Sequence, residues 1–473
     1  MRKKGRLKMP TLNDKKKKFQ FPSSPLMLFV IIVLVTLLTY VVPAGQYSYV
    51  LDEATGYEVV DGDSFTYMEQ SPVNPFRMFV AIKEGFLDGA QIIFLILFGY
   101  FWVYSVMQTG AFTAMINSLL KGRAKDSKLF IPIVMLVFAL AGSTYGEFET
   151  VYGLIPIFVA LSIALGYDAL VGMCMSGMAV AVGFASATTN PFTIGIAQTF
   201  GQLPMFSGLS YRWIIFVVFY LVAVALVMRY ALKIKKDPTK SLVYGLDYSA
   251  FNVETGDNIV FTGRHKILML GMVATVGTIV YGSLQLDWYI NEMSAVFIIS
   301  GILSAIVGGK GPEGICKDLI TSLSEMTTAM VVVGLSRAIL VIMKNGVIID
   351  TVIHAMNGMM EGLPAWATAE MMLVVQNFLN FFIPSGSGQA AAIMPIMIPL
   401  ADLSEVNRQI AVLAYQFGDG FSNLLWPTAS CTIMCGIAKI PMGKWYRFFL
   451  PIFAVFFVLQ AIFIFIAVQM NYS

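Results

Sequence analysis

Two long apolar segments, each interrupted near its centre, constrain the fold of this chain most strongly. Segment 366–403 carries PSGSGQ at its middle, and segment 129–166 carries GSTYGEFET. As one straight helix, either segment would reach more than about 50 Å, whereas the hydrocarbon core of a bilayer is about 30 Å thick. Glycine permits a tight turn. We therefore expect each segment to form two short helical arms that enter the membrane and turn back at mid-depth.

The rest of the chain is apolar enough for an integral membrane protein. Of its 473 residues, 57% are hydrophobic and 12% are charged, against roughly 25% charged residues in soluble proteins. Segments of about 20 apolar residues recur, and their pattern lacks the alternation of barrel strands. The predicted fold class is an all-α polytopic membrane protein.

The distribution of charge predicts the orientation of the chain in the membrane. The N-terminal tail, 1–24, is rich in lysine and arginine, and so is the connection within 233–288. Both are expected in the cytoplasm, whereas the acidic loop 46–74 is expected outside. A membrane-surface role explains the basic tail better than a cleaved signal peptide or nucleic-acid binding does.

Two parts of the sequence resemble each other. SVMQTGAFTAMI (105–116) is similar to LVIMKNGVIIDTVI (340–353), and ATTNPFTIGIA (187–197) corresponds to LLWPTASCTIMCGIA (424–438). We predict a first repeat over 25–232, with a hairpin at 129–166 and a broken helix at 169–200. The second repeat covers 289–473, with a hairpin at 366–403 and a broken helix at 407–438. A linking span within 233–288 gives the repeats inverted topology. Chance similarity between apolar helices is the alternative.

Inverted repeats with broken helices are typical of secondary transporters, whose substrate sites lie where the repeats meet. Helix N-termini at the breaks suit a carboxylate, and helix C-termini suit Na⁺. The alternative is that hydroxyl groups there bond only to their own helix. The predicted substrate-binding residues are Ser143, Thr144, Tyr145, Thr188, Thr189, Asn190, Ser385, Gly386, Ser387, Gly388, Asn423 and Thr428. Na⁺ is expected near Ser143, Asn190, Ser385 and Asn423.

Charged residues within the apolar segments are candidate functional groups, because charges inside a membrane are costly. They are Glu147, Glu149, Asp419 and Arg337. Asp419 and one of the two glutamates are the best candidates for a carboxylate that carries a proton or binds an amine, and a structural cap is the alternative. The four cysteines are interpreted as small buried hydrophobes. No cofactor is expected apart from Na⁺ or H⁺ as coupling ion.

Several motifs resemble the YfcC-type branch of the anaerobic C4-dicarboxylate carrier (DcuC-like) family, within the ion-transporter superfamily. They are GSTYG (142–146), TTNPFTIGIA (188–197), PSGSGQAA (384–391), MPIM (394–397), GDGFSN (418–423) and GIAKIP (436–441). The resemblance implies an elevator-type carrier of small carboxylate-bearing metabolites in a bacterial inner membrane. It also implies a homodimer and, for some members, arginine/ornithine exchange. The sequence departs from relatives in a shorter stretch at 147–150 and in Trp426 before Pro427.

The predicted function is a secondary active transporter, working by symport or antiport, for an amino acid such as arginine or ornithine. A carrier of C4-dicarboxylates or other short organic acids is the alternative. A dicarboxylate would need a second cationic group, for which Arg337 is the one arginine near mid-membrane, whereas Glu147, Glu149 and Asp419 suit an ammonium or guanidinium group. A channel and an intramembrane protease are more remote. An aspartyl protease would require Gly-x-Gly-Asp, but position 416 is Gln, and no His-Glu-x-x-His occurs. An enzyme is therefore not expected.

Overall fold

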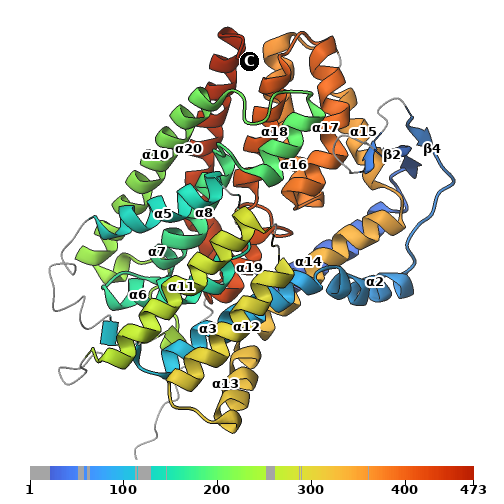
Figure 1. The fold of residues 1–473 in the computed structure, drawn as a ribbon. Coiled ribbons are helices and arrows are strands. Elements are labelled where there is room, and N and C mark those ends of the chain that lie inside the picture. The colour runs from blue at the N-terminus through green and yellow to red at the C-terminus, as the bar shows by residue number, and fades with distance from the viewer. Residues whose placement is uncertain are drawn as a thin grey trace, which may run out of the picture.

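The computed structural model describes residues 22–51, 58–60, 64–111, 114–115, 129–144, 146, 148–251, 261–286, 288, 290–360 and 362–472. These residues are mainly helical (Figure 1), which confirms the predicted all-helical class. Two small antiparallel sheets were not predicted: β1 (Gly45–Gln46) pairs with β4 (Thr66–Tyr67), and β2 (Tyr49–Leu51) pairs with β3 (Glu58–Val60). Most of the predicted basic tail, and site residues Tyr145 and Glu147, lie outside the described residues.

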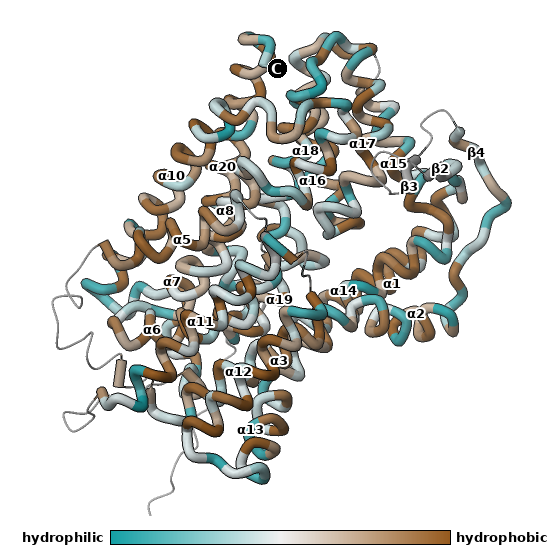
Figure 2. Tube along the Cα trace, in the orientation of Figure 1, coloured by the Kyte–Doolittle hydropathy of each residue, from teal (hydrophilic) through white to brown (hydrophobic). Residues whose placement is uncertain are grey.

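Five described helices are long and apolar enough to cross a membrane. They are α3 (Ala90–Gln108), α10 (Leu209–Lys236), α12 (Ile290–Val307), α14 (Thr327–Asn345) and α20 (Met442–Gln469). Hydrophobic colouring runs along much of their length in Figure 2. A helix bonds all its interior backbone groups within itself, so such segments are stable in hydrocarbon. α1 (Ser24–Leu38) and α11 (Gly263–Gln285) lie in the first span and the linking span predicted from sequence.

Two helices that the sequence reasoning missed precede α3 and α14. They are α2 (Pro75–Asp88) and α13 (Pro312–Glu325), each 14 residues long with proline at its start, where the missing N–H costs nothing. The Asn74 side chain accepts a hydrogen bond from the Arg77 N–H and caps α2. Both helices are too short and too charged to be found by a search for spans. A further short helix, α15 (Ile349–Gly358), follows α14.

Each of the two long apolar segments is divided in two. The first comprises α5 (Phe130–Thr144) and α6 (Val151–Ala164), and the second comprises α16 (Ala365–Phe382) and α17 (Gly386–Leu403). We call the described residues between α5 and α6 (146 and 148–150) the first tip and residues 383–385 the second tip. Proline and glycine at the second tip explain the break, because both are poor helix formers.

The segment that follows each pair is broken as well. After the first pair come α7 (Ala169–Met173), the π-helix η2 (Cys174–Met178) and α8 (Ala179–Ala185). A non-helical stretch then leads to the π-helix η3 (Pro191–Gly195) and to α9 (Ile196–Phe200). After the second pair, α18 (Arg408–Ser422) and α19 (Ser430–Ile437) flank an irregular stretch that contains Pro427. Two 3₁₀ turns, η4 (Pro238–Lys240) and η5 (Ser249–Phe251), follow α10.

Glycines bring the helices at the centre into backbone contact. A Cβ on Gly183 of α8 would lie 1.8 Å from the Ala139 carbonyl oxygen of α5. A Cβ on Gly420 of α18 would lie 2.3 Å from the Cα of Ala185, at the end of α8. Close approach through small residues is how helices pack in membranes, where no hydrophobic effect drives association. The first contact packs α8 against α5 within one half, and the second holds the broken helices of the two halves, α8 and α18, against each other.

Candidate functional site

A small cavity of about 40 Å³ lies between the two tips. Both tips contribute to its wall, and α8, η3, α12 and the first turn of α17 complete it. The lining residues are Gly146, Glu149, Phe184, Phe192, Thr193, Ile290, Met293, Ser385, Gly386 and Ser387. Two interruptions that are far apart in the sequence therefore form one cavity.

The first tip is fixed by hydrogen bonds between the end of α5 and the stretch before η3. The backbone N–H groups of Thr188 and Thr189 donate to the Ser143 carbonyl oxygen at 2.8 and 3.2 Å. The Ser143 hydroxyl lies 3.1 Å from Thr188 Oγ1 and donates to the Ser186 carbonyl at 3.2 Å. The last carbonyls of a helix have no partner within the helix. The Ser143–Thr188 contacts therefore serve to terminate α5.

Thr144 and Thr189 act mainly on the backbone. The Thr144 hydroxyl donates to the Leu140 carbonyl one turn earlier, at 2.7 Å, and the Thr189 hydroxyl donates to the Thr144 carbonyl at 3.1 Å. This is the packing role that was the alternative for hydroxyl groups in this region.

Asn190 and Thr193 carry unpartnered polar atoms beside the cavity. Asn190 is fully buried, and its Oδ1 caps η3 by accepting from the Phe192 N–H at 2.9 Å. Its Nδ2 and the Thr193 hydroxyl have no hydrogen-bond partner among the described residues. Gly146 has a φ of +77°, and a Cβ there would lie 2.2 Å from Asn190 Oδ1. Only glycine fits that backbone and that approach.

The first turn of α17, directly after the second tip, packs against η3 of the other half. The Ser385 side chain caps α17 by accepting from the Gly388 N–H at 3.3 Å, and the Tyr415 hydroxyl donates to the Gly386 carbonyl at 2.6 Å. A Cβ on Gly386 would lie 2.7 Å from Thr193 Cγ2. The first turn of α17 has N–H groups without partners inside the helix, and Gly386 and Ser387 of this turn line the cavity.

Asn423 and Thr428 do not line the cavity. The Asn423 amide donates to the Asp419 carbonyl at 2.8 Å, and the Thr428 hydroxyl donates to the Phe381 carbonyl at 2.6 Å. The Trp426 indole donates to the Asn377 carbonyl at 2.5 Å. These bonds stabilise the break after α18 and tie it to α16, as Thr188 and Thr189 tie the first break to α5.

Two carboxyl groups lie in this region: Glu149 lines the cavity, and Asp419 packs against Gly386, another residue of the cavity wall. Asp419 is fully buried, and neither carboxylate oxygen has a hydrogen-bond partner among the described residues. A Cβ on Gly386 would lie 3.2 Å from Asp419 Oδ2, so this carboxylate sits against the first turn of α17. The positive end of that helix dipole favours an anion. Glu149 is the carboxyl group that lines the cavity itself.

Arg337 lies in a second, larger pocket of about 550 Å³. Its Nη1 is 3.6 Å from a carboxylate oxygen of Asp88, and both residues line this pocket together with Lys344 and Asp350. Ser385 lines the larger pocket and the small cavity alike. The second tip therefore separates the two spaces.

The sequence reasoning missed several residues of the site. Besides Thr193 and Tyr415, it missed Gln416, whose amide donates to the Phe184 carbonyl at 2.6 Å, and Asn380, which donates to the Asp419 carbonyl at 3.0 Å. Tyr415 is four residues before Asp419 and therefore lies on the same face of α18. A row of polar residues at this spacing on an apolar helix is the sequence pattern that could have indicated Tyr415.

The residues expected near Na⁺ fall into separate groups. Ser143 and Asn190 belong to the first break, Asn423 to the second, and Ser385 lies between the cavity and the larger pocket. Within the described ranges, no three His, Cys, Asp or Glu side chains cluster as metal ligands. Thr193, which lines the cavity, and Asp419, which packs against Gly386, carry side-chain oxygens without a hydrogen-bond partner among the described residues.

Helices long and apolar enough to span a membrane surround a small cavity with polar groups in its wall. This arrangement is that of a multi-pass membrane transporter. A family model described as C4-dicarboxylate anaerobic carrier matches residues 21–469. The chain belongs to this family of secondary transporters, and it is therefore not an enzyme.

Two relatives match over nearly their whole length. An Escherichia coli K12 protein named "Putative basic amino acid antiporter YfcC" is 28% identical, over 96% of this chain and 98% of its own. An uncharacterized protein of Haemophilus influenzae is 27% identical, over 97% of this chain and 99% of its own.

Among solved structures, the YdaH transporter of Alcanivorax borkumensis is similar with a TM-score of 0.42 and 14% identity, over 95% of this chain and 99% of that one. MtrF of Neisseria gonorrhoeae is similar with a TM-score of 0.42 and 18% identity, over 95% of this chain and 96% of that one.

Proposed function

We propose that this transporter carries an amino acid with a cationic side chain, such as arginine or ornithine, by exchange or by coupling to Na⁺ or H⁺. The supporting observation is the pair of carboxyl groups beside the two tips: Glu149 lines the cavity, and Asp419 is buried against Gly386 of the cavity wall. A buried carboxylate without a hydrogen-bond partner is costly. A bound guanidinium or ammonium group would neutralise it. The helix N-terminus at Gly386 would receive the substrate carboxylate.

The printed description of the Escherichia coli relative supports this class of substrate. The family description favours a C4-dicarboxylate instead. A dicarboxylate needs a second cationic group, and the candidate for it was Arg337. That guanidinium lies 3.6 Å from a carboxylate oxygen of Asp88, and Arg337 lines the larger pocket and not the cavity. The distribution of charge therefore favours the cationic amino acid.

The membrane arrangement that we propose has two repeats of inverted topology, each with a re-entrant hairpin and a broken helix. Three helix pairs in the same order have equal lengths: α2 and α13 with 14 residues, α3 and α14 with 19, and α10 and α20 with 28. This equality supports a repeat. We place the N-terminus in the cytoplasm and the chain, as a homodimer, in a bacterial inner membrane.

The proposed mechanism is alternating access of the elevator type. A cavity of about 40 Å³ holds only a few water molecules, since one needs roughly 10–15 Å³. It is too small for an amino acid, so the site has to enlarge to bind one. Displacement of the second tip would join the cavity to the pocket at Arg337 and Asp88, because Ser385 lines both.

Counterflow in proteoliposomes tests the substrate. Vesicles loaded with unlabelled arginine should accumulate labelled arginine or ornithine, while vesicles loaded with succinate should not accumulate labelled succinate. Uptake of succinate without uptake of any amino acid would overturn the proposal in favour of the dicarboxylate. Unitary currents in a planar bilayer would indicate a channel instead.

A further inference from the structure

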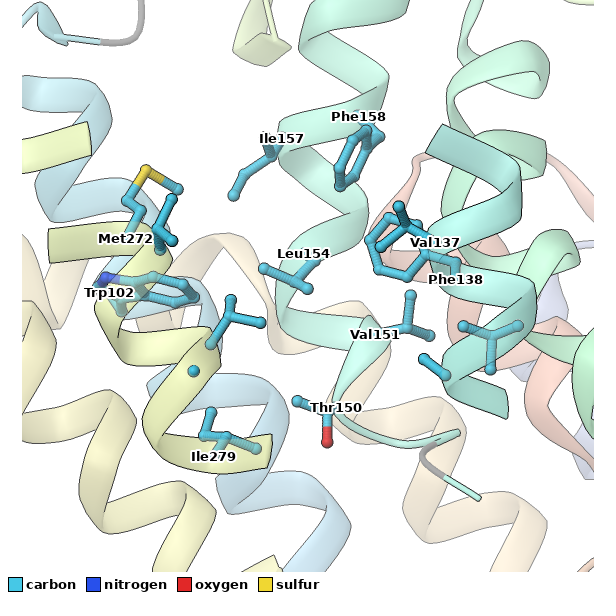
Figure 3. Close-up of a pocket in the computed structure, with 15 residues that line it drawn as sticks. Trp102, Val137, Phe138, Thr150, Val151, Leu154, Ile157, Phe158, Met272 and Ile279 are labelled. Atoms are coloured by element: carbon cyan, nitrogen blue, oxygen red, sulfur yellow. The ribbon is translucent and has the colours of Figure 1, made fainter. Parts of the chain in front are cut away.

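An apolar groove of about 470 Å³ runs beside the first tip, apart from the candidate substrate site. α5, α6 and α8 form one wall, and α3 and α11 form the other. The residues that line it are Trp102, Val137, Phe138, Ala141, Thr150, Val151, Leu154, Ile157, Phe158, Val180, Met272, Val273, Val276, Gly277 and Ile279. Figure 3 shows Trp102 and Met272 on one side of the groove and Val137 and Phe138 on the other.

The groove has a buried floor and an exposed apolar mouth. Trp102 and Ile279 are each 1% exposed, whereas Val137 is 61% and Val273 is 69% exposed. Val137 and Val273 belong to helices of apolar segments, α5 and α11. In a membrane protein, such exposed valines face the acyl chains of the bilayer. The groove therefore opens to hydrocarbon.

The chemistry of the lining restricts what fills the groove. Thr150 is the one residue in it with a polar side chain other than the Trp102 indole, and the Thr150 hydroxyl lies 3.4 Å from Met293 Sδ. The Trp102 indole N–H has no hydrogen-bond partner among the described residues. Water needs two to four polar partners and is not stable here. An empty space would forfeit the dispersion contacts of its lining. Cavities of about 150 Å³ already bind benzene.

We propose that this groove is a binding site for a phospholipid acyl chain, which enters from the bilayer between α5 and α11 and packs against Trp102. A hydrocarbon chain matches the apolar lining of a groove whose mouth faces the membrane, and it supplies the dispersion contacts that an empty space would forfeit. The occupant is part of the solvent in which the protein is embedded, so it is always at high local concentration. The proposal does not depend on which substrate is carried.

Quenching of Trp102 fluorescence by brominated lipid tests this site. The protein is reconstituted in phosphatidylcholine with acyl chains dibrominated near their middle, and in the same lipid without bromine. Emission of Trp102→Phe is subtracted to isolate the Trp102 component. This substitution removes no hydrogen bond and preserves an aromatic ring against Phe297, whose centroid lies 5.3 Å from that of Trp102. We expect the Trp102 component to lose most of its intensity in brominated lipid.

Two glycines on α11 supply a matched pair of variants. A Cβ at Gly277, inside the groove, or at Gly271, outside it, would have no heavy atom within 4 Å, so both accept a larger side chain. Gly277→Phe should fill the groove and restore Trp102 emission in brominated lipid, whereas Gly271→Phe should leave the quenching unchanged. Both variants should elute from size exclusion as the parent does.

Three outcomes would overturn the proposal. In the first, the Trp102 component keeps its intensity in brominated lipid. In the second, the Trp102 emission of Gly277→Phe is quenched as strongly as that of the parent, which would mean that bulk lipid causes the quenching. Alternatively, quenching could vanish as the protein-to-lipid ratio rises, which would mean that a second copy of the chain covers the groove.

Discussion

Replacing Asp419 by asparagine separates a functional carboxylate from a structural one. The two side chains have nearly the same shape, so packing is preserved, and only the ability to carry a negative charge is lost. A carboxylate that stabilises the fold does so through hydrogen bonds or ion pairs. Neither Asp419 oxygen has a hydrogen-bond partner among the described residues, although the residue is fully buried.

The magnitude follows from that environment. A buried charge costs several kcal/mol in effective desolvation, and the helix dipole at Gly386 returns about 0.3–2 kcal/mol of it. The amide in Asp419→Asn leaves one or two unsatisfied groups, as the carboxylate did. Without substrate, the variant should therefore be as stable as the parent or more stable, by up to about 1–3 kcal/mol.

Substrate binding should change in the opposite direction. Arginine at 100 times its dissociation constant stabilises the parent by about 2.7 kcal/mol. Loss of a buried charge pair costs about 2–5 kcal/mol. A variant with 100-fold weaker affinity would retain only about 0.4 kcal/mol of stabilisation at the same concentration.

The assay is thermal unfolding in detergent with and without arginine, combined with counterflow. Asp419→Asn should have an unchanged or raised melting temperature, a lost arginine shift and no uptake. Asp402→Asn is the matched control, because Asp402 is 44% exposed and paired with Arg408 at 2.6 Å. An exposed pair contributes about 0–1 kcal/mol. Asp402→Asn should therefore keep both the arginine-induced shift in melting temperature and the uptake. A clear fall in melting temperature with a preserved arginine shift would refute the reasoning.

Three further outcomes follow from the packing and the charges. Gly183→Val should abolish folded protein in size exclusion, because its Cβ would lie 1.8 Å from the Ala139 carbonyl, while Gly271→Val, in open space, should fold normally. Ser143→Ala should lower stability to denaturant by about 1–2 kcal/mol, because it removes the hydroxyl contacts with Ser186 and Thr188. Arg337→Gln should alter the KM for arginine several-fold without abolishing counterflow, because Arg337 lines the larger pocket rather than the cavity; complete loss of uptake in folded protein would contradict this.

The sequence alone predicted the parts of this protein that depend on local composition and length. Segment 366–403 is too long for one crossing and contains proline and glycine where the chain turns, so a break between α16 and α17 followed directly. Charged residues in apolar segments pointed to Glu149 and Asp419 in the same way. These inferences needed only the thickness of a bilayer and the cost of unpaired backbone groups.

Other features were beyond local reasoning. α2 and α13 are too short to register as spans, and the strands of the 45–67 region are only two or three residues long. Thr193 and Tyr415 become part of the site only because Gly386 approaches both of them. Thr428, Asn423 and Thr144, predicted to bind substrate, donate hydrogen bonds to backbone carbonyls, which no sequence pattern indicated.

The sequence by itself determined that this chain is a helical membrane protein with two interrupted segments, because hydrocarbon allows few backbone conformations and each leaves a pattern along the chain. Only the tertiary structure decided which polar groups share the cavity and which hold a broken helix together. A hydroxyl or amide looks the same in both roles in a sequence. Its role depends on which acceptor lies within about 3 Å, and helices from distant parts of the chain set that distance.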